Sequence, residues 1–380
     1  MDGERSPQGT LTAPFGVEAA KPRPSRAHGI AAIAGLDLGT NNCRLLVARP
    51  DGAHLRVIDS FSRAVRLGDG IEKSGALDPL AMDRAVGALR ICAEKLRRSA
   101  PERVRAVATA ACRQALNGAD FARRVREETG IALEIIGPEE ESRLAVAGCG
   151  PLVDPAAERV LIFDIGGGST ELVLLDLVSV PPEARAAEVR AIRADSGGAV
   201  SAAEREGQGA RIIDWVSIPV GVATLQDKFA EIADSGRRFG LMTWYFEELI
   251  EGFARRMALE AAERPLQLIG ASGSVTTIGS AYLGLRRYDR SRVDGLWLPS
   301  RAARRIAREL ASLPEASRVQ HPSIGPDRAK LIVASCAILS AILCAWPTER
   351  IRVADRGLRE GLIYTQTGAA QGAALNGAGR

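Results

Sequence analysis

The sequence has no hydrophobic run long enough to cross a membrane, and it has few aromatic residues. None of its apolar runs reaches the roughly 18 residues that a membrane helix needs, so no membrane partner is expected. Aromatic residues make up 4% of the 380 residues, and the formal net charge is only +4. Nucleic-acid binding usually needs a broad basic face or a platform of stacking rings, so nucleic acid is not an expected partner either.

Closely spaced cysteine pairs are also missing. The six cysteines include no Cys-x-x-Cys pair, and the histidines, His28, His54 and His321, are scattered. Such pairs are typical of zinc sites and redox motifs, so neither is predicted. Cys336 and Cys344 lie in an apolar helical stretch and are expected to be small core residues. This use of cysteine fits a reducing, cytoplasmic compartment.

One pattern occurs twice: an apolar run, an aspartate, an apolar residue, a polar or glycine-rich turn and a second apolar run. The two aspartates, Asp37 and Asp164, lie 127 positions apart. Glycine lets such a turn bring backbone N–H groups close to a ligand, where they form a concavity that binds anions. The repeat predicts two related domains that clamp a phosphate. The residues expected to bind it are Gly39, Thr40, Asn41 and Asn42 in the first turn and Gly166, Gly167, Gly168 and Ser169 in the second.

Each aspartate ends an apolar run that is typical of a buried strand. A bare carboxylate would repel phosphate, so Asp37 and Asp164 are expected to face a cation, Mg²⁺ or another divalent ion, held partly through water. The alternative for either turn alone is an ordinary β-hairpin, because glycine and aspartate are also common turn residues.

A third glycine-rich turn favours the phosphate interpretation. It follows another apolar run and opens a helix predicted from Ser274 to about Leu283. A helix N-terminus attracts phosphate through its free N–H groups. Gly270, Ser272 and Gly273 are therefore further phosphate-binding candidates.

Together with three further stretches, at 113–117, 135–144 and 355–361, these turns resemble the exopolyphosphatase and guanosine pentaphosphate phosphohydrolase (Ppx/GppA) family. The resemblance runs from about Gly35 to about Tyr364. It implies an α/β fold with two actin-like domains, of the ribonuclease H-like ASKHA superfamily, and an interdomain cleft. It also implies a hydrolase that releases the terminal phosphate of inorganic polyphosphate, the 5′ γ-phosphate of guanosine pentaphosphate, or both.

The resemblance assigns the catalytic role to Glu141, which precedes Ser142 and Arg143 in the family's register. A carboxylate there would orient and partly deprotonate the attacking water. On the residues alone, the alternative is that the three glutamates at 139–141 only favour a helix N-terminus through its dipole. The resemblance also places Arg113 against a substrate phosphate.

For the other arginines, the sequence predicts less definite roles. Arg143 would bind phosphate or pair with a neighbouring acid, and the sequence leaves both open. Arg359 would pair with Glu360 or an adjacent carboxylate. Arg44 and Arg66 are weaker anion-binding candidates, and the arginines expected on an ordinary solvated face are Arg286, Arg287 and Arg290.

The chain is expected to divide into a disordered tail at 1–29, a first domain at 30–145, a second domain at 146–365 and another disordered tail at 366–380. The second domain would carry a flexible insertion at about 181–208, with a short helix at 182–192 as the alternative for its start. The tails and the insertion are rich in small, polar or charged residues, which do not build a core. The first tail lacks the apolar stretch of a secretory signal.

One helix is predicted in more detail. Asp78, followed by proline, is a favourable N-cap. Leu80, Leu89, Cys92 and Leu96 are expected to mark the buried face of this helix.

Two other functions stay open: an ATP-dependent kinase or ATPase of the same superfamily, and a nucleotide sensor without activity. The acidic segment at 139–141 and the sequence at 357–361 favour the hydrolase. Asn42 stands where many family members have serine, but its amide can still donate hydrogen bonds. The chain resembles the short two-domain form of the family, so a homodimer is one way to complete a longer polyphosphate channel.

Overall fold

The protein is described here from a computed structural model, which covers residues 31–51, 54–192, 209–261 and 264–377. The predicted N-terminal tail lies outside these residues, as does most of the predicted insertion. The start of that insertion is helical, with a 3-10 turn at Pro182–Ala184 followed by α6, Arg185–Arg190. Among the described residues, no helix is long and apolar enough to cross a membrane.

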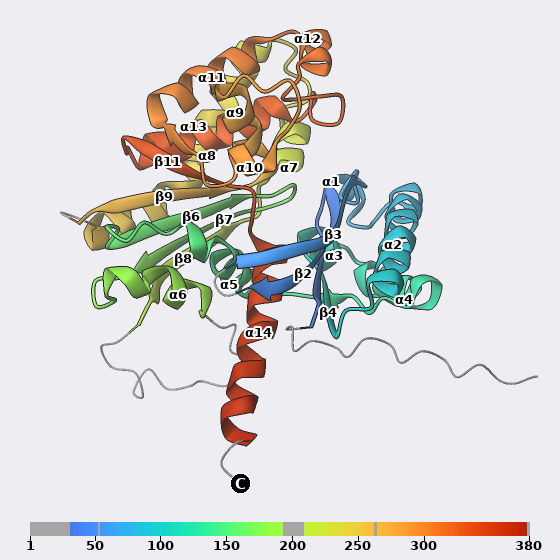
Figure 1. Cartoon of the computed structure of the whole chain (residues 1–380). Helices are drawn as coiled ribbons and strands as arrows, with labels where there is room; N and C mark the ends of the chain where they lie inside the picture. Colours follow the sequence, from blue (N-terminus) through green and yellow to red (C-terminus); the bar gives the residue numbers. More distant parts are fainter. Residues whose placement is uncertain (1–30, 52–53, 193–208, 262–263, 378–380) are drawn as a thin grey trace, which may run out of the picture. The chain divides into compact units, whose positions relative to one another are not determined.

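The first sheet has five strands in the order β3-β2-β1-β4-β5. β1 pairs antiparallel with β2 and parallel with β4, and α2 and α4 lie side by side next to this sheet (Figure 1). The elements of this region are β1 Ile33–Leu38, β2 Asn42–Asp51, β3 His54–Ala64, α1 Ile71–Ser74, α2 Pro79–Ser99, β4 Arg103–Ala108, α3 Ala110–Gln114, α4 Gly118–Thr129, β5 Glu134–Ile135 and α5 Pro138–Cys149.

The second sheet has six strands in the order β10-β11-β9-β6-β7-β8. In Figure 1, α8, α9, α11 and α13 lie together on one side of this sheet and α6 lies on the other. The remaining elements are a 3-10 turn at Gly150–Leu152, β6 Arg159–Ile165, β7 Thr170–Asp176, β8 Arg211–Ile218, α7 Val222–Lys228, α8 Ser235–Ala261, β9 Leu266–Ala271, α9 Gly273–Tyr282, α10 Arg290–Val293, β10 Trp297–Pro299, α11 Ser300–Ser312, α12 Glu315–Gln320, α13 Ile332–Ala345, β11 Arg350–Ala354 and α14 Leu358–Gly377.

Helix α13 shows how the core of the second sheet forms. Its side chains from Ile332 to Leu343 are all buried. A helix that is apolar on every side has to be surrounded by protein. Residues of α8, α9 and α11 and of the sheet strands provide that surrounding in one continuous core.

The repeated sequence pattern folds as the same hairpin in both sheets. In the first hairpin Asp37 of β1 pairs with Arg44 of β2, and in the second Asp164 of β6 pairs with Glu171 of β7. The turns also match: the N–H of Gly39 donates to the carbonyl of Asn42 at 2.9 Å, and the N–H of Gly166 donates to that of Ser169 at 2.9 Å.

The predicted cap of α2 is confirmed, but its predicted buried face is partly wrong. The Asp78 carboxylate accepts a hydrogen bond from the N–H of Ala81. Leu89 and Cys92 are buried, whereas Leu80 is 69% exposed. Nine residues at about 100° each place Leu80 half a turn away from Leu89, on the opposite side of the helix. Alanines complete the buried face instead.

Two further expectations differ from the structure. Cys336 is buried in α13, but Cys344 is exposed in the last turn of that helix. The segment from residue 366, expected to be a disordered tail, is helical as far as Gly377 because α14 continues through it. Alanine has the highest helix propensity of all residues, and the glycines between the alanines do not outweigh it.

Helices α5 and α14 touch backbone to backbone. A Cβ atom on Gly361 of α14 would overlap the carbonyl oxygen of Leu144 in α5, and one on Gly148 of α5 would overlap the carbonyl of Gly357. These contacts hold α5, the helix that carries Glu141, directly against α14.

The close contact between α5 and α14 predicts that two glycine-to-alanine changes differ in their effect on stability. Gly361→Ala should lower the free energy of unfolding by about 1–3 kcal/mol, because the added methyl group overlaps backbone that cannot move freely. Gly87→Ala in α2 is the matched control: nothing lies within 4 Å of its added methyl group, and it should stabilise the protein by about 0.5–1 kcal/mol. Urea unfolding followed by circular dichroism measures both. Equal stability of the two variants would contradict the close crossing.

Candidate active site

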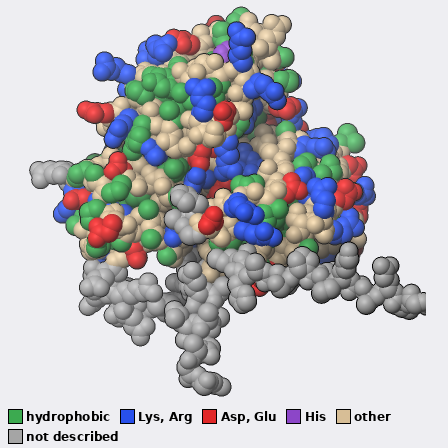
Figure 2. Space-filling view, in the orientation of Figure 1, with side chains coloured by type: hydrophobic (Ala, Val, Ile, Leu, Met, Phe, Trp, Pro, Cys, Tyr) green, Lys and Arg blue, Asp and Glu red, His purple; other side chains and the backbone are tan. Residues whose placement is uncertain are grey.

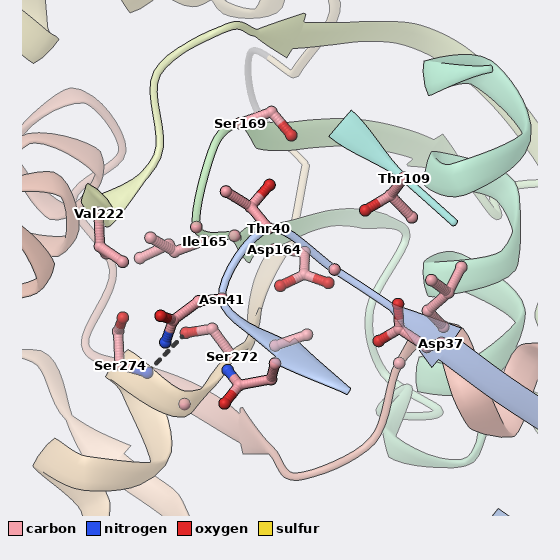
Figure 3. Close-up of a pocket in the computed structure, with 18 of the residues that line it drawn as sticks. Asp37, Thr40, Asn41, Thr109, Asp164, Ile165, Ser169, Val222, Ser272 and Ser274 are labelled. Atoms are coloured by element: carbon pink, nitrogen blue, oxygen red, sulfur yellow. Dashed lines mark hydrogen bonds between the residues drawn. The ribbon is translucent and has the colours of Figure 1, made fainter. Parts of the chain in front are cut away.

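One pocket collects both predicted phosphate turns, the third glycine-rich turn and Glu141. Figure 3 shows Asp37 and Asp164 among its lining residues, together with Thr40, Asn41 and Ser169. The predicted site residues that line this pocket are Asp37, Gly39, Thr40, Asn41, Asn42, Glu141, Asp164, Gly166, Gly167, Gly168, Ser169, Ser272 and Gly273.

The two predicted phosphate turns contact each other. A Cβ atom on Gly167 would lie 3.0 Å from the Cβ of Thr40 and 3.2 Å from the backbone nitrogen of Asn41. A Cβ atom on Gly168 would lie 2.8 Å from the Thr40 hydroxyl oxygen. Glycine is therefore required in the second turn for the first turn to approach it.

Neighbouring segments hold both turns in shape. The carbonyl of Asn41 accepts the N–H groups of residues 65 and 66 at 2.8 and 3.0 Å. In the second turn, the carbonyls of Gly166 and Gly167 accept the first N–H groups of α7 at 2.9 and 2.8 Å. Because these carbonyls already have partners, the turns are organised before any ligand binds.

The three glutamates at the start of α5 differ in their partners. Glu139 forms an ion pair with Arg143 at 2.7 Å, and Glu140 forms one with Arg105. Of the three, Glu141 is the one that lines the pocket. A helix dipole does not distinguish these residues, whereas their directions around the helix do. The structure also shows Arg143 paired with a neighbouring acid, one of the two alternatives that the sequence left open.

Arg113 holds Glu141 in place. Its Nη1 atom donates to the Glu141 carboxylate at 3.0 Å and to the carbonyl of Ile136 at 2.9 Å. The Glu141 side chain is 15% exposed, and burial raises its pKa to about 7, against the lowering effect of Arg113 and with a further increase from Asp37 and Asp164. A carboxylate with a pKa near 7 suits a general base at neutral pH.

Two predicted phosphate-binding residues do not line the pocket. Arg113 lies beyond Glu141 and contacts it instead. Gly270 lies in β9, where an added Cβ would be 2.6 Å from the Phe163 ring. Its glycine is therefore explained by packing in the sheet.

The contact between Arg113 and Glu141 makes the pH dependence of turnover testable. We expect Arg113→Met to lower kcat at pH 7 by roughly fivefold, because an increase of about one unit from a pKa near 7 reduces the ionised fraction of Glu141 from about one half to about one tenth. The acid limb of the kcat profile should move to higher pH, since loss of the guanidinium removes an effect that lowers this pKa. A bound cation would move the same limb to lower pH.

The control for Arg113→Met is Arg105→Met, which removes the partner of the adjacent Glu140. It should leave the profile unchanged. A large increase in KM without a shift of the acid limb would instead show that Arg113 binds substrate phosphate.

Asp37 and Asp164 fit the predicted cation site in their chemistry. Burial raises the pKa of both carboxyl groups, to about 7 for Asp164, while Arg44 opposes the increase. Within the described ranges, no group of three His, Cys, Asp or Glu side chains forms a complete metal cage. Mg²⁺ usually binds one or two carboxylates and takes its other ligands from water and substrate phosphates. Asp37 and Asp164 can provide the two carboxylates.

The pocket also contains Glu171 and Arg328, which were not predicted from the sequence. Glu171 is buried opposite Asp164, accepts a hydrogen bond from Ser217 at 3.1 Å, and has its pKa raised by burial and by nearby carboxylates. Glu171 follows Asp164 by seven positions, as Arg44 follows Asp37, and this repeated spacing could have identified it. No sequence pattern marks Arg328, because it lies in an irregular segment before α13.

The end of the pocket formed by residues 354–359 is supported by a buried ion-pair cluster. Glu360 accepts hydrogen bonds from Arg290 at 2.7 Å and from the N–H of Gly357 at 3.0 Å, and its carboxylate lies 3.9 Å from Arg359. Burial acts to raise the pKa of Glu360, but the two arginines outweigh it and lower the pKa. The expected pairing of Arg359 is confirmed. The expectation of a solvated Arg290 is wrong, because the fold brings α10 against the start of α14.

Comparisons with known proteins show the fold and the family. The sequence profile of the Ppx/GppA phosphatase family matches residues 46–181 and 179–369. A family member from Aquifex aeolicus is 24% identical, with 89% of this chain and 97% of that chain covered and a TM-score of 0.67. An exopolyphosphatase from Cytophaga hutchinsonii is 23% identical, with 89% and 98% covered and a TM-score of 0.74. An exopolyphosphatase-like protein is 25% identical, with 88% and 99% covered and a TM-score of 0.73.

The predicted α/β fold, with its two actin-like, ribonuclease H-like sheets, is confirmed by these likenesses and by the matching hairpins. The profile match spans most of the chain. It begins within β2, after the first turn, and includes the second turn, Glu141 and the segment at 355–361. From this match and the fold, the chain belongs to the Ppx/GppA phosphatase family.

Proposed function

We propose that the protein is a phosphoanhydride hydrolase that releases the terminal phosphate of inorganic polyphosphate or the 5′ γ-phosphate of guanosine pentaphosphate. The observation that carries this proposal is that Glu141 lines the same pocket as both phosphate turns. A hydrolase of this kind needs a held phosphate and a held water, and these residues can supply both.

In the proposed reaction, the N–H groups and hydroxyls of the two turns bind the terminal phosphate. Glu141 accepts a hydrogen bond from a water aligned with the bond that breaks, and takes its proton as the oxygen attacks phosphorus. The bond to the leaving phosphate breaks, and the products are orthophosphate and the shortened chain. A divalent cation held by Asp37 and Asp164 would neutralise charge on the phosphate oxygens.

Two arginines favour a substrate with more than one phosphate. Arg44 and Arg328 both line the pocket, and neither forms an ion pair with any acidic residue that the structure describes. Burial, and then the charge of Arg44, lower the pKa of Arg328. Arg328 is positioned by donating to the carbonyl of Gly273 at 3.0 Å and to the Thr277 hydroxyl at 2.6 Å. A polyanion would relieve the repulsion between the two guanidinium groups.

A phosphate-release assay tests the proposal. Purified protein with Mg²⁺ is given polyphosphate, guanosine pentaphosphate or ATP, and orthophosphate is measured over time. Release from polyphosphate or pentaphosphate, abolished by a chelator, is the expected result. Release from ATP alone, or phosphate transfer to an acceptor, would instead identify an ATPase or a kinase.

A further inference from the structure

Arg66 stands beside the pocket in an unusual backbone conformation. Its φ angle is 48°, in the left-handed region that residues with a side chain rarely adopt. A strained residue of this kind persists only where its surroundings hold it. The contacts of its backbone and of its guanidinium therefore bear on its role.

The backbone at Arg66 is held against the first phosphate turn. Its N–H donates to the carbonyl of Asn41 at 3.0 Å, and the N–H of Gly68 donates to that of Thr40 at 3.0 Å. Arg84 donates to the carbonyls of residues 65 and 66 at 3.0 and 3.2 Å. These contacts tie the position of Arg66 to the turn that receives the phosphate.

Among the residues that the structure describes, the guanidinium of Arg66 has only a weak partner. Its Nη2 atom lies 4.0 Å from the carboxylate of Asp327, and the two side chains are 45% and 76% exposed. An exposed pair at this distance contributes little stability. Asp327 directly precedes Arg328, which lines the pocket. The pair thus connects the segment beside the first turn to a segment of the pocket wall.

We propose that Arg66 is a specificity residue that binds a phosphate group beyond the terminal one, and that Asp327 holds it until a polyanion displaces the carboxylate. This proposal rests on the proposed function. A phosphate can accept two parallel hydrogen bonds from a guanidinium. Such a contact is stronger than the 4.0 Å contact between Arg66 and Asp327. Residues that bind the terminal phosphate would not discriminate chain length, whereas Arg66 would.

The test uses Asp327→Asn, Arg66→Gly and the double variant in the full chain, with tripolyphosphate and long polyphosphate as substrates. Glycine is chosen because it adopts a positive φ without strain, so the loop keeps its shape. We expect Arg66→Gly to raise KM by about three- to tenfold, equivalent to one lost charge-assisted contact, with kcat nearly unchanged. Asp327→Asn should lower KM by a smaller factor.

The double variant gives the decisive comparison. If Asp327 acts through Arg66, Asp327→Asn should have no further effect on KM once Arg66 is glycine. Asp120→Asn is the matched control, because Asp120 is an exposed acid paired with Arg123 on α4; its KM should equal that of the wild type.

Two results would overturn the proposal. An equal effect of Asp327→Asn on KM in both backgrounds would mean that the carboxylate acts on Arg328 or through the overall electrostatic potential of the pocket. A lower kcat with unchanged KM in Arg66→Gly would mean that this residue only shapes the turn. If the wild type releases no phosphate at all, the proposed function fails, and tripolyphosphate binding measured by calorimetry still decides the role of Arg66.

Discussion

Glu141→Gln should lower kcat by about 10²–10⁴-fold while substrate still binds. Glutamine keeps the size of the side chain and can still accept the hydrogen bond from Arg113, but its amide cannot take a proton from water. The pocket position of Glu141 and its raised pKa make it the residue whose loss should reduce turnover most. The measurement combines steady-state phosphate release with the affinity for a substrate, determined by calorimetry at a pH where turnover is slow.

Glu140→Gln is the control for this change, because Glu140 lies one position away on α5 and pairs with Arg105 outside the pocket lining. Its turnover should stay near that of the wild type. Near-normal turnover of folded Glu141→Gln would move the role of base to another acid, and Glu171 would then be the first to test because it also lines the pocket.

Asp164→Ala should lower the rate by about 10²–10³-fold and weaken the dependence on Mg²⁺, and Asp37→Ala should act in the same direction. Charge neutralisation by a bound cation contributes several kcal/mol to transition-state stabilisation, and each 1.36 kcal/mol corresponds to a factor of ten. Both carboxylates are buried in the pocket lining and raise the pKa of Glu141. Titrations of activity with Mg²⁺, and of Mn²⁺ binding by electron paramagnetic resonance, measure the effect.

Asp214→Ala is a suitable control, because Asp214 pairs with Arg256 and does not line the pocket. It should leave both titrations unchanged. If Asp37→Ala and Asp164→Ala also gave wild-type titrations, the two aspartates would be hairpin residues without a role in cation binding.

Features that depend on neighbours in the sequence were predictable. The two hairpins each close within eight residues, so glycine and aspartate at the right spacing specify them. The Asp78 cap, the helix that begins at Pro138 and the turn that opens α9 are also local, because a cap or a turn is satisfied by backbone groups a few residues away. The family resemblance added the choice of Glu141, which local pattern alone did not make.

Features that join distant segments were decided by the tertiary structure. Arg113 meets Glu141 across 28 positions, and Arg290 meets Glu360 across 70. Arginine is common on surfaces, and its long side chain reaches partners in many directions, so its position in the sequence does not reveal them.

By itself, the sequence determined the two related hairpins, the order of strands and helices around them, and the acidic start of α5. The tertiary structure decided which glutamate enters the pocket, that Arg113 supports Glu141, and that Arg328 joins the site. The physical reason is the distance along the chain between the interacting groups. Hydrogen bonds of turns and caps form within a few residues, whereas the direction of a side chain in a pocket depends on packing between elements that are far apart in the chain.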